Sequence, residues 1–153
     1  MLVFVPLDRA GLAAWATGRP PQTTGFAATA SFLDAFGLPS PDDEDAERTL
    51  LAIASLAGLL SHGVRLVAVA EAGRPERDEP ADFGAVQVSA LPWRAVSALF
   101  ADEPASADAV AAAASELAGA ELPEAWDHPA AEQLLTSCDL LWHGSAEFET
   151  LSG

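Results

Sequence analysis

Apolar positions along the chain recur at two spacings, and each spacing predicts a different kind of element. Residues 2–7, 64–72 and 83–89 are runs of branched, aromatic and small apolar residues bounded by Pro, Gly or polar residues, which is typical of strands. Residues 24–28 form a weaker run of the same kind, and residues 138–144 form one near the end of the chain. These segments predict a sheet of four to five strands.

Helical spacing marks the segments between the first strands. Asp8 is an N-cap candidate for a helix that follows the first strand, and Thr29 is one for a second, short helix. The longest apolar stripe predicts a helix with Ser40 as its N-cap, Pro41 at its first position and Gly63 at its C-terminal end. This helix is expected to be the central helix of the domain.

The second half of the chain predicts three further helices. One covers residues 92–100, an alanine-rich one is capped by Ser106, and a short one begins at Pro129. Residues 122–129 predict a turn. Residues 73–82 are polar and rich in proline, so they predict an exposed loop that joins the two flanking strands as an antiparallel hairpin.

Strands and helices follow one another without strict alternation, which favours the α+β class. We therefore expect one domain over residues 1–153, with helices packed on a mixed or mainly antiparallel sheet. A doubly wound fold is less favoured because no glycine-rich phosphate loop follows the first strand.

The charge of the chain is strongly negative: 23 acidic residues against 7 arginines give a net charge of −16. This balance disfavours direct binding to nucleic acids and to anionic membranes, both of which require basic clusters. It favours a solvated acidic surface that keeps the protein soluble. The same surface could also imitate nucleic acid and bind a protein partner with a basic surface. A single cysteine forms no internal disulfide, the first residues lack a basic leader, and no apolar run reaches membrane-span length, so the expected compartment is the cytoplasm.

The candidates for chemistry are Asp8, Cys138 and His143. Asp8 follows the first strand, where carboxylates often line sites. Cys138 and His143 lie five apart on a predicted strand, so they face opposite sides and form no dyad with each other, although Cys138 could meet another histidine through the fold. On this pattern Cys138, Leu140 and Trp142 are expected to face a packed layer.

Motifs for metals and cofactors are missing from the sequence. The acidic run at residues 42–47 has Arg48 and Ala54 where a calcium-binding loop requires glycine and glutamate, and helix capping explains it better. Ser145 lacks the second glycine of a nucleophile elbow. We expect no metal and no cofactor.

Four stretches together resemble a known family: "MLVFVPLDRAGLAAW", "DDEDAERTLLAIASLAGLL", "RLVAVAEA" and "CDLLWHGSAEFETL". The chain is similar to a family of small acidic proteins from actinobacteria, known only as a domain of unknown function. Members carry a tyrosine where this chain has Phe4 and another where it has His143, so the resemblance implies no hydroxyl chemistry at either place and brings no catalytic residues.

The sequence thus leaves the function unknown and two hypotheses open. The first is a non-enzymatic cytoplasmic interaction or regulatory domain with an acidic surface. The alternative is a small enzyme or small-ligand-binding protein whose site matches no known motif.

Overall fold

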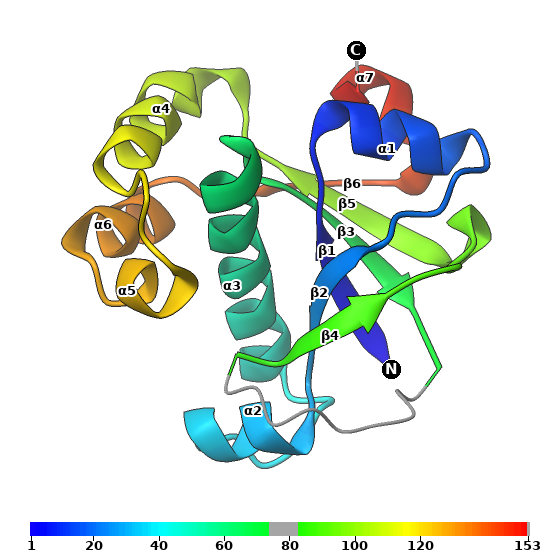
Figure 1. Cartoon of the computed structure of the whole chain (residues 1–153), viewed down its shortest axis with the longest axis horizontal. Helices are drawn as coiled ribbons and strands as arrows, with labels where there is room; N and C mark the ends of the chain where they lie inside the picture. The colour runs from blue at the N-terminus through cyan, green and yellow to red at the C-terminus, as the bar shows by residue number, and fades with distance from the viewer. Residues whose placement is uncertain (74–82, 153) are drawn as a thin grey trace.

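A computed structural model describes residues 1–73 and 83–152 of the chain. All but the first residue of the loop predicted at 73–82 lies outside the described residues. The described residues form one six-stranded antiparallel sheet with helices packed on it, which confirms the α+β class and adds a strand to the predicted four to five (Figure 1). The strand order is β4-β2-β1-β3-β5-β6. The strands are β1 (Leu2–Pro6), β2 (Thr23–Ala27), β3 (Leu66–Glu71), β4 (Ala85–Val88), β5 (Val96–Ala101) and β6 (Leu141–His143).

The helices lie on both faces of this sheet. The long helix α3 crosses one face, with α4, α5 and α6 beyond it, while α1 and α7 lie side by side on the other face (Figure 1). The bounds are α1 (Arg9–Ala16), α2 (Ala30–Phe36), α3 (Glu44–His62), α4 (Ala107–Glu116), α5 (Leu122–Trp126), α6 (Pro129–Ser137) and α7 (Phe148–Ser152).

Alternation along the central strand β1 divides the core between the two faces. Val3 and Val5 pack toward α1, where the Trp15 side chain is fully buried. The Trp15 indole donates a 2.8 Å hydrogen bond to the Leu91 carbonyl. Phe4 packs on the opposite face, together with the buried side of α3. A third apolar cluster joins α3 to the helices α4, α5 and α6.

Of the four predicted N-caps, Asp8 and Thr29 are confirmed and Ser40 is wrong, while Ser106 occupies the N-cap position of α4 without a capping hydrogen bond from its side chain. Asp8 Oδ1 accepts from the Gly11 amide at 2.6 Å, and the Thr29 hydroxyl accepts from an amide of α2. The long helix, however, begins at Glu44 with Asp43 as its N-cap, not at Ser40. The Ser40 hydroxyl instead accepts from the Asp42 amide in a turn before the helix, because two capping residues compete for the same stretch.

The predicted hairpin between the third and fourth strands is wrong. β3 lies between β1 and β5, and β4 pairs with β2 at the far edge of the sheet, where Thr23 lies opposite Val88. A continuous apolar run such as β3 is typical of a strand with neighbours on both sides, but apolar periodicity carries no information about which strand the neighbour is.

The helix predicted at residues 92–100 is also wrong. A short 3-10 turn at Trp93–Ala95 leads directly into β5, which pairs with β3 on one side and with β6 on the other. The apolar positions of this segment fit both helical spacing and strand alternation, and pairing with two neighbouring strands outweighs the helical pattern. The turn predicted at residues 122–129 is instead largely helical, since α5 occupies Leu122–Trp126.

Gly84 is expected to tolerate no side chain where β4 meets β2. Its φ is +78°, its carbonyl accepts from the Ala27 amide at 2.9 Å, and a Cβ atom would collide with the Ala27 carbonyl oxygen. Gly37 has a similar φ of +64° but open space around it. Gly37→Ala should therefore cost the ~1–2 kcal/mol of left-handed strain alone. Gly84→Ala should cost about 1–3 kcal/mol more, for overpacking. Urea unfolding of both variants measures the difference in the free energy of unfolding. Equal losses would show that the backbone of β2 and β4 shifts at no cost to accommodate the added Cβ atom.

Candidate functional site

The three residues that the sequence suggests for chemistry lie on different elements. Asp8 begins α1, Cys138 ends α6, and His143 ends β6. Among the described residues, no hydrogen bond or ion pair joins any two of them. Asp8 is occupied as a helix cap, so its carboxylate already has a structural task.

Cys138 does not lie on a strand, so the argument from alternating faces does not apply to it. It is the C-cap of α6, and its amide donates to the Leu134 carbonyl at 3.0 Å. The residue is half-buried and borders a small cavity of about 170 Å³ between α4 and α6. The expected packed layer is wrong for Trp142, whose residue surface is 64 % exposed.

His143 and Glu147 form a local pair at the end of β6. Nδ1 of His143 lies 3.9 Å from Oε1 of Glu147, while Oε2 of Glu147 accepts from the Gly144 amide at 2.6 Å. This arrangement closes the turn that follows the strand. No nucleophile of the described residues is hydrogen-bonded to the His143 imidazole, so this pair is not a catalytic dyad.

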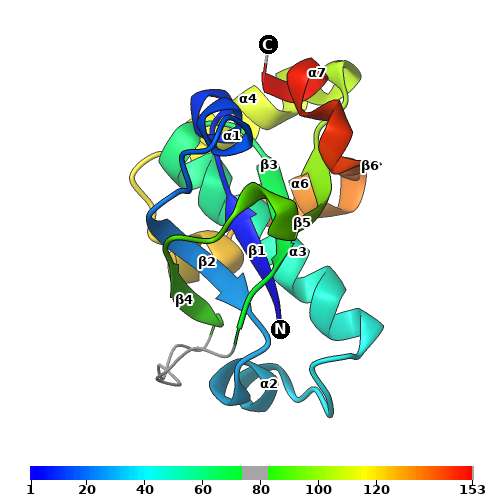
Figure 2. The same ribbon diagram turned by 90° about the vertical axis from the view of Figure 1, so that its right-hand side faces the viewer.

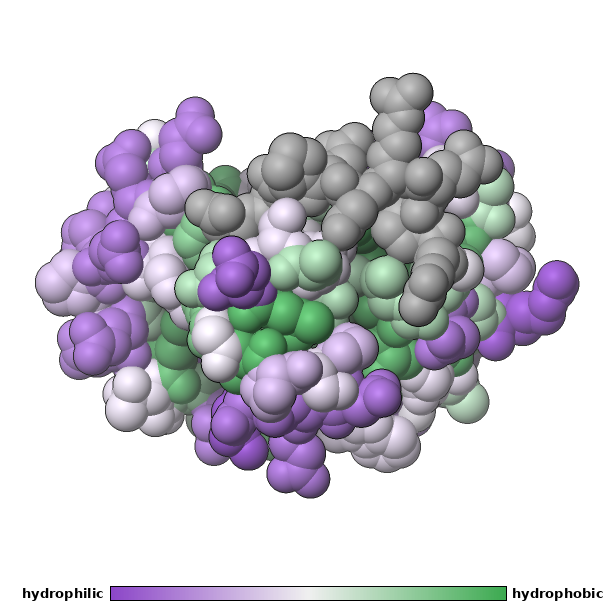
Figure 3. All heavy atoms as spheres, turned by 90° about the horizontal axis from the view of Figure 1, so that it is seen from below, coloured by the Kyte–Doolittle hydropathy of each residue, from purple (hydrophilic) through white to green (hydrophobic). Residues whose placement is uncertain are grey.

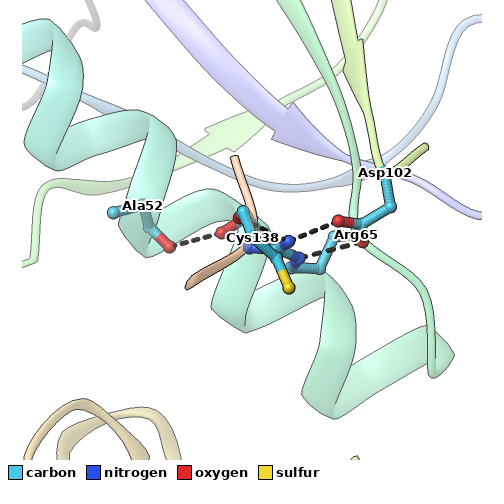
Figure 4. A network of polar contacts seen from close by, with 5 residues as sticks. Ala52, Arg65, Asp102 and Cys138 are labelled. Carbon is cyan, nitrogen blue, oxygen red and sulfur yellow. Dashed lines mark hydrogen bonds and ion pairs between the residues drawn. The ribbon is translucent and has the colours of Figure 1, made fainter. Parts of the chain in front are cut away.

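The sequence reading missed a buried ion pair between Arg65 and Asp102. Nε of Arg65 donates to Oδ2 of Asp102 at 2.9 Å, and Nη2 of Arg65 donates to Oδ1 of the same carboxylate (Figure 4). Nη2 also donates to the Cys138 carbonyl at 2.9 Å. The Arg65 side chain is 1 % exposed and that of Asp102 is 15 % exposed. Nε and Nη2 of Arg65 and both carboxylate oxygens of Asp102 therefore have partners, and the pair ties the start of β3 to the end of β5 and to the end of α6. The sequence signal that could have found the pair is a basic residue directly before one apolar run, at Arg65, and an acidic residue directly after another, at Asp102.

The exposed apolar side chains gather instead on β6. Leu141 and Trp142 are 43 % and 64 % exposed, and no other large hydrophobic residue of the described ranges is comparably exposed. Trp15, Trp93 and Trp126 all pack edge-on against aromatic rings, with centroid separations of 5.7–5.9 Å. Trp142 has no aromatic partner in the described structure, so it differs from the three packed tryptophans in exposing its ring to solvent.

β6 is also an edge of the sheet, at the rim of the molecule in Figure 2. It pairs with β5 alone, with Trp142 opposite Phe100 and Leu141 opposite Ala101. Along the side turned away from β5, no strand of the described residues pairs with it. The arrangement offers backbone hydrogen-bonding groups and two apolar side chains, one on each face, to an incoming chain.

Three further observations concern an apolar area of the surface, metal binding and membrane crossing. Seen from below, hydrophobic side chains form a small area among hydrophilic ones (Figure 3). Within residues 1–73 and 83–152, no three His, Cys, Asp or Glu side chains are grouped to hold a metal ion. In the same ranges, no helix has the length and apolar character needed to cross a bilayer.

Comparison with protein-family models places the chain in a family. A protein-family model described as "Family of unknown function (DUF6912)" matches residues 1–151. The chain belongs to this family. The DUF6912 match confirms the resemblance to a domain of unknown function and covers every strand and nearly every residue of the described helices. No curated protein and no solved structure matches the chain.

Proposed function

We propose that this chain is a protein-interaction domain whose partner docks along β6. The observation that carries the proposal is the coincidence of a free sheet edge with the two large apolar side chains that are most exposed in the described structure. Partners that add a strand to a sheet use these two resources: backbone hydrogen bonds for affinity and alternate side chains for specificity.

The composition of β6 supports this role. Proteins protect free edges by keeping the edge strand very short, or with lysine, proline, bulges or inward charges, because an unprotected edge recruits other chains. β6 is short, at three residues, but it contains none of the other devices, and its pairing with β5 is regular. The opposite edge strand, β4, turns Gln87 outward, and the amide of this residue is bonded to the Thr24 hydroxyl at 3.3 Å. The two edge strands therefore differ, and of these two, within the described ranges, only β6 presents exposed large apolar side chains.

The charge around β6 favours a basic segment as the occupant. Residues 138–149 include Asp139, Glu147 and Glu149, all exposed, and no arginine or lysine. A second copy of the chain would bring these carboxylates together and would add its own net charge of −16. Like charges across an interface are unfavourable, so an extended segment of another protein, rich in lysine or arginine, fits this edge better than self-pairing.

An enzymatic function has less support in the described residues. The Asp8 carboxylate caps a helix, the Cys138 thiol borders a small cavity and the His143 imidazole faces a glutamate. For the compartment we propose the cytoplasm, supported by the single cysteine, which forms no internal disulfide. An actinobacterial origin remains part of the same proposal and is supported by the sequence resemblance.

The docking surface can be tested with a displayed library of extended peptides that alternate apolar with varied residues. We expect selection to enrich lysine and arginine, and the selected peptides to protect the amides of β6 from hydrogen exchange. Trp142→Ala should weaken binding of a selected peptide about 30-fold, the effect of losing a ~2 kcal/mol hot spot.

Gln87→Ala, on the opposite edge, is the matched control and should leave the affinity unchanged. Selected peptides without basic residues would overturn the charge argument. An affinity that falls with Gln87→Ala and not with Trp142→Ala would move the site to β4 and so contradict the proposal. Dimerisation lost in Trp142→Ala, measured by sedimentation, would show a second copy as the occupant instead.

A further inference from the structure

A hollow of about 500 Å³ opens on the α3 face of the sheet, far in sequence from β6. Its walls are the last turn of α3, the end of β1, the beginning of β2 and the segment that leads into α5. The hollow is open to solvent over much of its extent, and its volume falls within the range of pockets that bind small molecules. Because its lining comes from four separate parts of the chain, the fold itself builds the hollow.

One side of the hollow is apolar. Pro6 and Phe26 contribute from the sheet, Leu60 contributes from α3, and Leu122 contributes from the first turn of α5. Each of these side chains is at least partly shielded by the protein, and Phe26 is only 3 % exposed. This side can therefore take the hydrocarbon part of a ligand.

The other side carries hydroxyl, imidazole and carboxylate groups. Thr23, Ser61, His62 and Glu121 line the hollow, and within the described part of the chain their side chains make no hydrogen bond. Glu121 is notable because it occupies the N-cap position of α5, yet its carboxylate caps no amide of that helix. The group is thus left available to a ligand.

The electrostatic character of the hollow is negative. The C-terminal end of α3, a helix of 19 residues, carries the partial negative charge of the helix dipole. The Glu121 carboxylate adds a full charge, and no arginine lines the hollow. The carbonyls of Leu60 and Ser61 accept no backbone amide from the described residues beyond α3. The site is therefore suited to a cation that donates hydrogen bonds.

We propose that this hollow binds a small amine. The ammonium group donates to the Glu121 carboxylate and to the hydroxyls of Ser61 and Thr23. The apolar part of the ligand lies against Phe26 and Leu122. A carboxylate-bearing molecule of the same shape is repelled by the same groups. The proposal is independent of docking at β6, because the two sites share no residue.

The test compares 2-phenylethylamine with 3-phenylpropionate, which have similar bodies and opposite charges. Titration of the ¹⁵N-labelled chain with each probe at millimolar concentration reports binding through amide shifts. The amine is expected to produce saturable shifts at residues 60–62 and 119–122, and the acid is expected to produce none there. Equal responses to both probes, or shifts without saturation, would overturn the proposal.

Glu121→Gln should weaken amine binding about tenfold or more, since it removes the paired charge. Glu124→Gln is the matched control: it removes the same charge only three residues along the chain, on an exposed part of α5 that does not line the hollow. Equal weakening in the two variants would show that the amine responds only to the net charge of the chain. No weakening in Glu121→Gln would show that the Glu121 carboxylate does not bind the amine, which contradicts the proposal.

Discussion

Asp102→Asn is expected to lower the free energy of unfolding by about 3–5 kcal/mol, the usual cost of removing one partner of a buried ion pair. The substitution preserves the shape of the side chain but leaves the Arg65 guanidinium, 1 % exposed, without a counter-charge. The Cys138 carbonyl, at the end of α6, then accepts its hydrogen bond from a buried cation that has no counter-charge. Urea unfolding followed by circular dichroism measures the loss.

The exposed pair between Arg48 and Asp45 supplies the matched control for this prediction. These side chains are 75 % and 66 % exposed, and Nη1 of Arg48 lies 3.1 Å from Oδ1 of Asp45. Asp45→Asn should cost at most about 1 kcal/mol, because water screens the pair. Losses of similar size in Asp102→Asn and Asp45→Asn would contradict a stabilising role for the buried pair. Arg65→Met combined with Asp102→Leu should recover part of the loss, because it removes both charges together.

Trp15→Ala is expected to cost about 3–5 kcal/mol, since it empties the largest fully buried side chain from the core. The ring packs edge-on against Trp93 at a centroid separation of 5.7 Å, and its indole nitrogen satisfies the Leu91 carbonyl. Truncation therefore creates a cavity and also leaves a carbonyl without its donor. Thermal and urea unfolding of the variant report the loss directly.

Trp142→Ala is the natural comparison, because it makes the same chemical change at a site that is 64 % exposed. It should alter stability by no more than about 0.5 kcal/mol, as is usual for surface positions. A large loss in Trp142→Ala would mean that β6 is part of the core after all. A small loss would also establish that the variant is folded, which the peptide-binding experiment requires.

Local signals in the sequence predicted local structure well. The side chains of Asp8 and Thr29 cap the helices that follow them, and Gly63 ends α3, because each of these features depends on a few neighbouring residues. The apolar runs of β1, β2 and β3 were predictable for the same reason. Where two local signals compete, as Ser40 and Asp43 do before α3, the choice between them depends on the rest of the fold.

Features that depend on distant partners were not predictable. Val96–Ala101 has an apolar pattern that also suits a helix, and only its pairing with β3 and β6 makes it a strand. Trp142 resembles a core residue in sequence, and only its place on an edge strand exposes it. Rarity drew attention to Cys138, yet in the structure its backbone carbonyl makes the notable contact, with Arg65. Side-chain identity gives no signal for a backbone role.

The strand order has a consequence for how the chain folds. No two neighbouring strands of the sheet are joined by a tight hairpin: β1 and β2 are separated by α1, and every other pair is farther apart in sequence. Phe4 must find Val69 before the centre of the sheet exists, and Thr23 must find Val88 before the β4 edge is added. Loop-closure entropy opposes each of these encounters. Folding should therefore take milliseconds to seconds, as in proteins dominated by non-local pairing, with the helices forming before the sheet closes.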